Sequence, residues 1–261
     1  MQLSQRIHAW AYYRRKSKTK FRIHSPFVYD LIVNIFEDHT PNSTYRQVEE
    51  RKKQLEYDHR RITRTDFGTG NKQPAPEVKV SSIAKKHSIN RRYGRLLFRL
   101  SGRFHPKTIL ELGTSLGIST SYLACACPES IIYTLEGCPE TLALARETFH
   151  IADAARIEWL PGNFDLVLPG LLENIRQLDL VFMDGNHKRD AVLRYFRQML
   201  PKFHNDMVVI IDDIHWSHDM ELAWAEIGKT ANVTVTIDLF QLGLVFFKKE
   251  LSKQDFIIRY F

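Results

Sequence analysis

The sequence has little cysteine and no long apolar run. Its three cysteines, Cys125, Cys127 and Cys138, cannot all pair, and Cys125-x-Cys127 lacks the second ligand pair of a zinc site. This argues against a disulfide-stapled secreted domain and predicts a cytoplasmic chain with reduced thiols. No apolar run approaches the length needed to span a bilayer, and residues 1–6 have no apolar stretch of the signal-peptide kind. We therefore expect no membrane span.

The charge is divided unevenly along the 261 residues. Residues 1–105 hold 23 Lys and Arg against 9 Asp and Glu, whereas residues 106–261 hold 14 against 21. We expect a basic, mainly helical N-terminal extension or cap over 1–105 and an α/β domain over 106–261. The basic region could face an anionic partner such as RNA or a membrane surface, or could simply be a solvated face that offsets the acidic part. The second interpretation is slightly favoured.

The first 29 residues interleave seven Lys and Arg with aromatic side chains, a composition that suits stacking on bases beside phosphate contacts. However, apolar residues recur there at helical spacing, which more often indicates packing against the main domain. They are Ile7, Trp10, Ala11, Phe27, Leu31, Ile32 and Ile35. Further along, we expect a polar helix at 44–65, a loop at 65–80 and a basic amphipathic helix at 90–104. Residues 66–87 are a candidate flexible loop over the active site.

The central feature of the chain is a strand that turns on glycines into a helix. Residues 107–112 are a short apolar run with one carboxylate, Glu111, and the run leads into Gly113 and Gly117. After Gly117 the apolar period changes to that of a helix, which is typical of the first unit of an open parallel α/β sheet. Glu136 ends the next apolar run, where a carboxylate can accept hydrogen bonds from ribose hydroxyls. Together these residues favour a nucleoside cofactor.

Strand and helix patterns alternate through the rest of the chain. Strands are expected at 107–112, 130–136, 156–160, 179–183, 207–211, 232–238 and 241–248, and helices at 118–127, 139–150, 164–176, 188–200 and 219–229. The five βα repeats predict right-handed crossovers and a parallel sheet, and the last two strands are close enough to pair as a hairpin. The fold class is therefore α/β, with a doubly wound, mostly parallel sheet of seven strands.

Polar residues follow the carboxyl ends of the predicted strands, which is where ligands bind in open α/β sheets. Besides the glycine turn and Glu136, they comprise Gly162 and Asn163 after the third strand, Asp184 and His187 after the fourth, and Asp212, Asp213 and His215 after the fifth. Neighbouring carboxylates repel one another unless a cation lies among them, and oxygen ligands favour Mg²⁺, Ca²⁺ or Mn²⁺. The alternative is that each Asp caps the following helix. For Asp184, Asp212 and Asp213 taken together, a metal site is favoured over helix capping.

The glycine turn resembles a known family. Glu111-Leu-Gly113-Thr-Ser115-Leu-Gly117-Ile-Ser119 is similar to the first motif of class I S-adenosylmethionine-dependent methyltransferases, and its serines resemble the metal-dependent O-methyltransferases of the catechol type. The match extends from about Tyr93 to Lys249. It implies a Rossmann-like methyltransferase fold with the last strand antiparallel. It also implies a cofactor-binding set formed by Glu111, Gly113, Ser115, Gly117, Ser119, Glu136, Gly162, Asn163 and Asp184.

The resemblance also implies roles in catalysis. Asp184-Gly-Asn-His187 resembles the Asp-Gly-x-His motif of an O-methyltransferase branch in which Asp binds metal and His removes the proton of the substrate hydroxyl. An imidazole suits a general base near neutral pH. Asp212-Asp213 resembles the metal-binding Asp-Asn pair of that family, with Asp213 in place of Asn. His187 and Asp184 are thus the predicted catalytic residues, and Asp184, Asp212 and Asp213 the predicted ligands of a divalent metal, Mg²⁺ first.

The predicted function is methyl transfer from S-adenosylmethionine to a hydroxyl group of a small molecule with divalent-metal assistance. An RNA methyltransferase that uses the basic residues 1–105 to hold nucleic acid is the main alternative. A binding module that has lost catalytic activity is less favoured, because Glu111, Glu136, Asp184 and His187 are all present. A nicotinamide oxidoreductase is least favoured, since the chain lacks Gly-x-Gly-x-x-Gly. The oligomeric state is left open, with a homodimer as one option.

Overall fold

The computed structural model describes residues 3–65, 77–152 and 156–260, with side chains described from Arg6 onward. It divides the chain into two compact units. Unit 1 comprises Met1–Asp38 and Ile175–Phe261, and unit 2 comprises His39–Asn174. The expected division at 105/106 falls inside unit 2, so the compact units do not coincide with the predicted extension and domain. Each unit is described here on its own.

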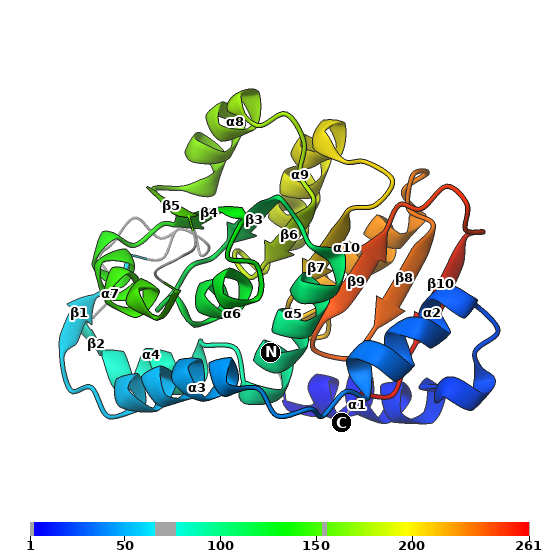
Figure 1. Ribbon diagram of the computed structural model, residues 1–261, viewed down its shortest axis with the longest axis horizontal. Coiled ribbons are helices and arrows are strands. Elements are labelled where there is room, and N and C mark those ends of the chain that lie inside the picture. The colour runs from blue at the N-terminus through cyan, green and yellow to red at the C-terminus, as the bar shows by residue number, and fades with distance from the viewer. Residues whose placement is uncertain (1–2, 66–76, 153–155, 261) are drawn as a thin grey trace. The chain divides into compact units, whose positions relative to one another are not determined.

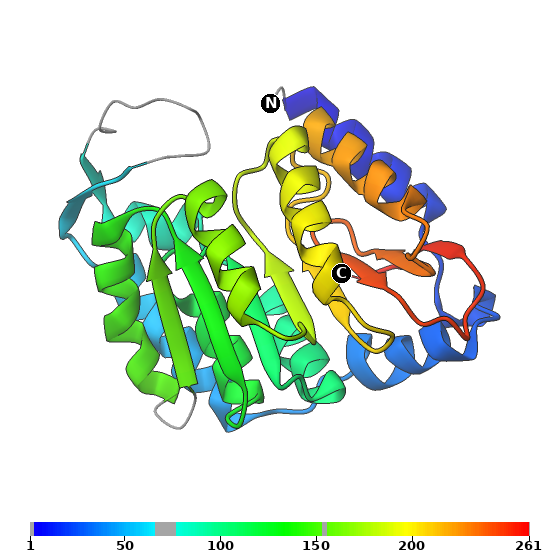
Figure 2. The same ribbon diagram turned by 90° about the horizontal axis from the view of Figure 1, so that it is seen from above.

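Unit 2 contains three parallel strands, β3 (Thr108–Leu112), β4 (Ile131–Glu136) and β5 (Arg156–Pro161), in the order β3-β4-β5. They run side by side in Figure 2. Helices α6 (Ile118–Ala126) and α7 (Pro139–Phe149) lie on one side of these strands and α8 (Phe164–Asn174) on the other, as Figure 1 shows. Helices on both faces bury both sides of the strands, which confirms the doubly wound α/β architecture for these βα repeats.

The first part of unit 2 differs in places from expectation. Helix α3 (Ser43–Glu56) ends well before residue 65, and β1 (Arg61–Thr63) follows and pairs antiparallel with β2 (Glu77–Lys79). The helix is shorter because Tyr57 and Asp58 close it through 3₁₀-type hydrogen bonds to Gln54 and Leu55. Residues 77–86 are not loop, since α4 (Val80–Lys86) follows β2 directly and buries Val80 and Ile83. The rest of the expected active-site loop, 66–76, lies outside the described residues.

Helix α5 (Arg91–Phe104) confirms the predicted amphipathic helix and packs closely on α6. Asn90 caps it by accepting a hydrogen bond from the Tyr93 backbone N–H. Gly94 makes the close approach possible, since a Cβ atom at this position would lie 2.3 Å from the ring atom Cε2 of Tyr122. The Tyr122 side chain is buried, so its ring has little room to move away.

We expect Gly94→Ala to destabilise the protein by about 1–3 kcal/mol, because the added methyl group overpacks a closed helix–helix contact. Gly102 is the matched control on the same helix, because nothing lies within 4 Å of a Cβ atom there. Gly102→Ala should stabilise by up to about 1 kcal/mol, since alanine has the higher helix propensity. Urea unfolding followed by circular dichroism measures both free energies. Equal effects of the two substitutions would contradict this packing explanation.

Unit 1 contains the strands β6 (Leu180–Met183), β7 (Val208–Ile211), β8 (Val235–Asp238), β9 (Gly243–Phe246) and β10 (Gln254–Ile257), in the order β10-β8-β9-β7-β6. Strands β6 and β7 are parallel, and β9 is inserted antiparallel between β7 and β8, as the resemblance implied. The connections of this unit include α9 (Arg189–Met199) and α10 (His218–Lys229). Strand β10, parallel to β8, is one strand more than the seven expected.

The two chain segments of unit 1 are joined by hydrogen bonds near the end of β10. Tyr13 of α1 (Leu3–Lys16) donates from its hydroxyl to the Ile258 carbonyl at 2.6 Å and accepts from the Tyr260 N–H at 2.9 Å. Helix α2 (Pro26–Leu31), capped by Ser25, buries Leu31, which confirms the predicted packing of this helix. Ile7 and Trp10 were expected to pack as well, but they are 57% and 44% exposed, because Tyr13 is the buried anchor of α1.

Within the described residues, no helix is both long enough and sufficiently apolar to cross a membrane. Cys125, Cys127 and Cys138 are all free thiols. Burial raises the pKa of Cys125 and of Cys127 to about 11, which keeps both thiols protonated at neutral pH. This agrees with the prediction that Cys125-x-Cys127 is not a zinc site.

Candidate active site

The glycine turn after β3 depends on backbone conformations that favour glycine. Gly113 has φ 108° and Gly117 has φ 78°, and Ser115 between them has φ 48°. A Cβ atom at Gly117 would lie 2.9 Å from the Phe149 ring, so this position is closed to larger residues by space as well as by conformation. Gly117 is the residue that precedes α6. The turn thus leaves the first N–H groups of α6 without a side-chain cap, as in anion- and nucleotide-binding turns.

Glu111 is completely buried in β3. Its Oε2 accepts hydrogen bonds from the hydroxyls of Thr120 at 2.5 Å and Thr134 at 2.6 Å. Burial raises the Glu111 pKa to about 7, although hydrogen bonding from the Ser119, Thr120 and Thr134 hydroxyls acts against the increase. Its Oε1 is buried without a hydrogen-bond partner, which is costly for a polar atom unless a ligand supplies the donor. Ser119, the residue before Thr120 in α6, is also buried.

Glu136 ends β4, and backbone groups orient its carboxylate. Oε2 accepts from the Ser115 N–H at 2.8 Å and Oε1 accepts from the Cys138 N–H at 2.9 Å. Burial raises the Glu136 pKa, and these backbone hydrogen bonds oppose the increase. The structure therefore brings the predicted ribose ligand, Glu136, into direct contact with the glycine turn.

Gly162 and Asn163 follow β5 at the same end of the strands. The Gly162 N–H donates to the Glu136 carbonyl at 2.9 Å, and the φ of Gly162 is 136°. The Asn163 side-chain oxygen accepts from the Asp165 N–H at 2.9 Å, so this side chain caps the start of α8. The capping role is an alternative to the cofactor contact that the resemblance implies for Asn163.

These residues fit an amino-acid-bearing nucleoside such as S-adenosylmethionine. Oε1 of Glu111 is a hydrogen-bond acceptor without a donor among the described residues. Glu136 presents a fixed carboxylate at the end of β4, which is the strand next to β3. Gly113, Ser115 and Gly117 keep the turn between them free of bulky side chains. All the cofactor-binding residues predicted in unit 2 thus gather at the carboxyl ends of β3, β4 and β5.

In unit 1, Asp184 and His187 share the loop between β6 and α9. His187 Nε2 lies 3.8 Å from Asp184 Oδ1, and the two side chains are 30% and 18% exposed. Asn186, at φ 52°, donates from its side chain to the Tyr195 hydroxyl at 3.2 Å and so anchors the turn to α9. The turn holds the imidazole beside a carboxylate and leaves it accessible, which is the arrangement that a general base requires.

Asp212 and Asp213 follow β7 in the same unit. Asp212 is buried, and its Oδ1 accepts from the Asp213 N–H at 2.8 Å. Burial and the neighbouring Asp213 carboxylate raise the Asp212 pKa to about 8. Burial also raises the Asp213 pKa, while His187 and Arg6 act in the opposite direction. Asp213 has φ 56°, an uncommon conformation outside glycine that often marks a functional turn.

The predicted metal ligands are Asp184, Asp212 and Asp213, which follow two strands of unit 1. Among the described residues, no three His, Cys, Asp or Glu side chains form a group that could hold a metal ion. Asp184, Asp212 and Asp213 therefore do not fit a three-ligand centre as they stand. Asp184 directly follows β6, and Asp212 and Asp213 directly follow β7, but the three side chains do not form a three-ligand group.

His215, another of the polar residues after β7, has carboxylate partners for both ring nitrogens. Nδ1 lies 3.0 Å from Glu221 Oε1 and Nε2 lies 2.8 Å from Asp238 Oδ2. Burial acts to lower the His215 pKa, but Asp238 and Glu221 outweigh it and the pKa is raised. A raised pKa means that these ion pairs contribute stability below the ordinary pKa and lose it as the pH rises through the raised value. His215 thus links Glu221 to Asp238, and this structural role leaves it poorly placed to act as a base.

Sequence reasoning did not single out Arg6, and it gave Trp216 no role. The Arg6 guanidinium lies over the Trp216 ring, with its Cζ atom 5.1 Å from the ring centroid. A pocket of about 410 Å³ lies between α1 and the start of α10, lined by His8, Ala9, Tyr12, His215, Ser217, His218 and Glu221. In the sequence, Arg6 is one of seven basic residues among the first 29. No spacing or motif connects it with a loop some 200 residues later.

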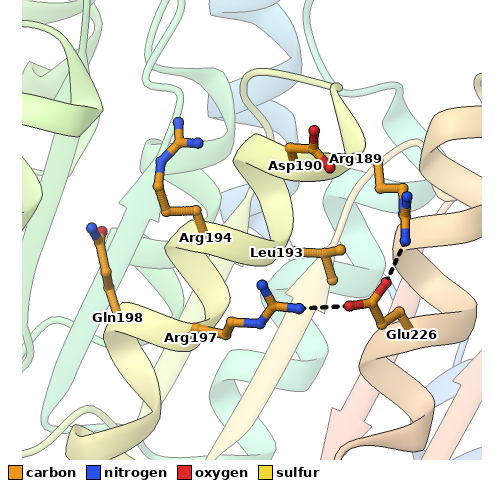
Figure 3. Close-up of a pocket in the computed structure, with 7 residues that line it drawn as sticks. All are labelled: Arg189, Asp190, Leu193, Arg194, Arg197, Gln198 and Glu226. Carbon is orange, nitrogen blue, oxygen red and sulfur yellow. Dashed lines mark hydrogen bonds and ion pairs between the residues drawn. The ribbon is translucent and has the colours of Figure 1, made fainter.

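A second pocket in unit 1, of about 600 Å³, lies between α9 and α10 (Figure 3). Glu226 of α10 lines the pocket and bridges two arginines of α9, at 2.9 Å from Arg189 and 2.6 Å from Arg197. Two of the guanidinium groups in this pocket are thus already paired with a carboxylate. We interpret this pocket as part of an ion-paired contact between α9 and α10 and not as a ligand site.

Comparison with known proteins gives one family match and several relatives. Residues 110–214 match the family described as a methyltransferase domain. The catechol O-methyltransferase of Mycobacterium tuberculosis is 29% identical over 129 residues, which cover 49% of this chain and 57% of that protein. A transmembrane O-methyltransferase homolog of Rattus norvegicus is 34% identical over 116 residues, 41% of this chain and 45% of that protein. The chain thus spans about half the length of these curated relatives.

Solved structures extend the likeness in fold. An O-methyltransferase from Bacillus cereus in complex with SAH is 19% identical, with a TM-score of 0.55, and the match covers 84% of this chain and 96% of that one. The O-methyltransferase TomG from Streptomyces achromogenes in complex with SAM is 17% identical, with a TM-score of 0.57, and covers 89% of this chain and 100% of its own. The match of residues 110–214 to a methyltransferase domain, together with the relatives named O-methyltransferases, confirms the resemblance to class I S-adenosylmethionine-dependent methyltransferases.

Proposed function

We propose that the protein transfers a methyl group from S-adenosylmethionine to a hydroxyl group of a small molecule. The observation that carries the proposal is the arrangement at the ends of β3 and β4, where the unpartnered Glu111 oxygen and the Glu136 carboxylate flank the glycine turn. The sequence relatives named O-methyltransferases support the same chemistry, and so does the accessible Asp184–His187 pair in unit 1.

The chain's own residues have distinct roles in this proposal. Glu136 accepts hydrogen bonds from the ribose hydroxyls, Glu111 accepts from the amino group, and Gly113, Ser115 and Gly117 leave room for the amino-acid end. S-adenosylmethionine, when bound, supplies an electrophilic methyl group on a sulfonium centre. His187 removes the proton of the acceptor hydroxyl, and Asp184 orients His187 and stabilises the imidazolium that forms. Alignment of the two reactants contributes much of the acceleration.

Divalent-metal assistance stays a prediction. The carboxylates of Asp184, Asp212 and Asp213 have the oxygen chemistry that Mg²⁺ prefers, but their side chains do not form a three-ligand group within the described residues. No step of the proposed reaction is therefore routed through a metal. Transfer to RNA is not favoured, since the comparisons name O-methyltransferases, and Tyr13 and Leu31 of the basic N-terminal segment are buried in unit 1.

A cytoplasmic location and a homodimer also stay predictions. The three free cysteines are consistent with a reducing compartment.

Thermal unfolding with added ligands tests the cofactor class directly. S-adenosylhomocysteine at 100 times its dissociation constant should stabilise the protein by about 2.7 kcal/mol, whereas NAD⁺ at the same concentration should leave the melting temperature unchanged. Each ligand is measured with and without Mg²⁺, which reports on the metal prediction in the same series. Stabilisation by NAD⁺ and none by S-adenosylhomocysteine would overturn the proposal.

A further inference from the structure

We propose that Lys52 of α3 is a positioning residue of the cofactor site. Its ammonium group fixes the connection between α4 and α5 (residues 87–90) against the glycine turn and favours the carboxylate at the amino-acid end of S-adenosylmethionine. The inference rests on the proposed function, because only that function brings an amino-acid end to the glycine turn. It assigns a role to a residue outside the methyltransferase domain match, which begins at residue 110.

The α4–α5 connection contacts the glycine turn through Ser115. The Ser115 hydroxyl donates to the His87 carbonyl at 3.5 Å, and the Ser115 N–H donates to Glu136 Oε2 at 2.8 Å. Ser115 therefore joins the connection to the carboxylate that we assign to the ribose. The Ser88 hydroxyl is buried without a hydrogen-bond partner among the described residues, which is costly unless a ligand supplies one. The connection thus borders the cofactor site and holds a polar group that a ligand would satisfy.

Lys52 holds the backbone of the same connection. Its Nζ atom donates to the Ile89 carbonyl at 2.8 Å and to the Ser88 carbonyl at 3.4 Å. Because a trans peptide unit is planar, fixing a carbonyl group also fixes the N–H group that points the opposite way in the same plane. With the His87 carbonyl bound by Ser115, side chains hold three successive carbonyl groups of the connection. The ammonium group therefore sets the orientation of the peptide groups beside the glycine turn.

Helix α3 carries Lys52 from a fixed position within unit 2. Val48 and Leu55 of this helix are completely buried, and Glu49 accepts a hydrogen bond from Arg95 of α5 at 2.7 Å. These contacts do not involve the Lys52 side chain. Substitution of Lys52 should therefore leave α3 in place and release only the connection that its ammonium group holds.

The charge of Lys52 is matched mainly by neutral groups. Lys52 is partly buried, and burial lowers its pKa, because the ammonium group loses hydration there. The two carbonyls that accept from it carry no net charge, and Glu56 on the same helix is the carboxylate that opposes the decrease of the pKa. A partly desolvated cation attracts an anion more strongly than a hydrated one does. S-adenosylmethionine has its only carboxylate at the amino-acid end, so this is the ligand group that Lys52 favours.

Calorimetric titration with two ligands tests the assignment without turnover. S-adenosylhomocysteine has the amino-acid end, whereas 5′-methylthioadenosine has the same nucleoside and lacks that end. Lys52→Met should weaken S-adenosylhomocysteine binding at least about tenfold, the scale of a hydrogen bond to a charged group, and leave 5′-methylthioadenosine binding unchanged. Lys52→Arg keeps the charge and should bind S-adenosylhomocysteine more tightly than Lys52→Met. The matched control is Lys53→Met, since Lys53 is the next residue of α3 and is exposed, and it should match the wild type with both ligands.

Two results would overturn the assignment. One is an equal loss of affinity for both ligands in Lys52→Met, which is the effect of a purely structural role, and the other is equal S-adenosylhomocysteine affinity in Lys52→Met and Lys53→Met. Lys52→Gln keeps a polar end group without the charge and takes the place of Lys52→Met if that variant does not fold, with the same selective loss expected. A wild type that does not bind S-adenosylhomocysteine contradicts the proposed function itself. Wild-type binding that Lys52→Met leaves unchanged contradicts only the role of Lys52, so the two failures are distinguishable.

Discussion

His187→Ala should slow methyl transfer about 10²–10⁴-fold, the range for loss of a general base. The imidazole lies 3.8 Å from the Asp184 carboxylate and is 30% exposed, so it is positioned but open to an acceptor. Cofactor binding should remain nearly intact, because the cofactor residues Glu111 and Glu136 lie on other strands. Single-turnover transfer to a panel of small hydroxyl acceptors gives the rate, and calorimetry with S-adenosylhomocysteine gives the affinity.

A second His–Asp pair in unit 1 serves as the control. His204 Nε2 lies 2.9 Å from Asp179 Oδ1, just before β7 and β6 begin, at the opposite ends of the strands from Asp184. His204→Ala removes an imidazole with the same kind of partner and should leave the rate of transfer unchanged. Wild-type turnover in His187→Ala would rule out the assignment of the base.

Glu136→Gln should weaken S-adenosylhomocysteine binding about 10–100-fold. The carboxylate accepts from the Ser115 and Cys138 N–H groups, and a side-chain amide can present an acceptor to only one of them. The substitution also removes the charge that strengthens hydrogen bonds from the ribose hydroxyls, each worth about 1.5–3 kcal/mol. Calorimetric titration measures the change in affinity.

Glu140→Gln is the matched control for that titration. Glu140 lies in the first turn of α7, four residues after Glu136, and its Oε2 accepts from the Thr63 N–H at 2.8 Å. It is a carboxylate bound to a backbone donor in the same unit, but it does not contact the glycine turn. An equal loss of affinity in Glu140→Gln would mean that the effect of Glu136→Gln is a general effect of charge.

The βα repeats and the cofactor side of the site could be predicted because their signals are local. Glycine is needed where φ is 108° at Gly113 and 78° at Gly117, and the apolar period changes at that point in the sequence. Strand β9 was expected to be antiparallel, and its pairing with β7 and β8 confirms this. Helix and strand boundaries in these repeats mostly fall within three residues of the expected ones.

The remaining features depend on contacts between residues that are far apart in the sequence. Strand β10 exists because its backbone pairs with β8, and its own residues carry only a short apolar pattern. Arg6 meets Trp216 across more than 200 residues, and His215 is occupied by Asp238 and Glu221 from two other elements. The side-chain orientations of Asp184, Asp212 and Asp213 likewise decide whether they can share a cation, and spacing alone does not report them.

The Tyr13 contact with Ile258 and Tyr260 has a consequence for how the protein forms during synthesis. Residues 39–174 of unit 2 are continuous, so the ribosome can release this whole unit while translation continues. Unit 1 needs residues 1–38 together with 175–261, and the hydroxyl of Tyr13 receives its backbone partners only after Ile258 and Tyr260 have been made. Helix α1, with the exposed indole of Trp10, therefore completes its packing only after more than 200 further residues have been synthesised.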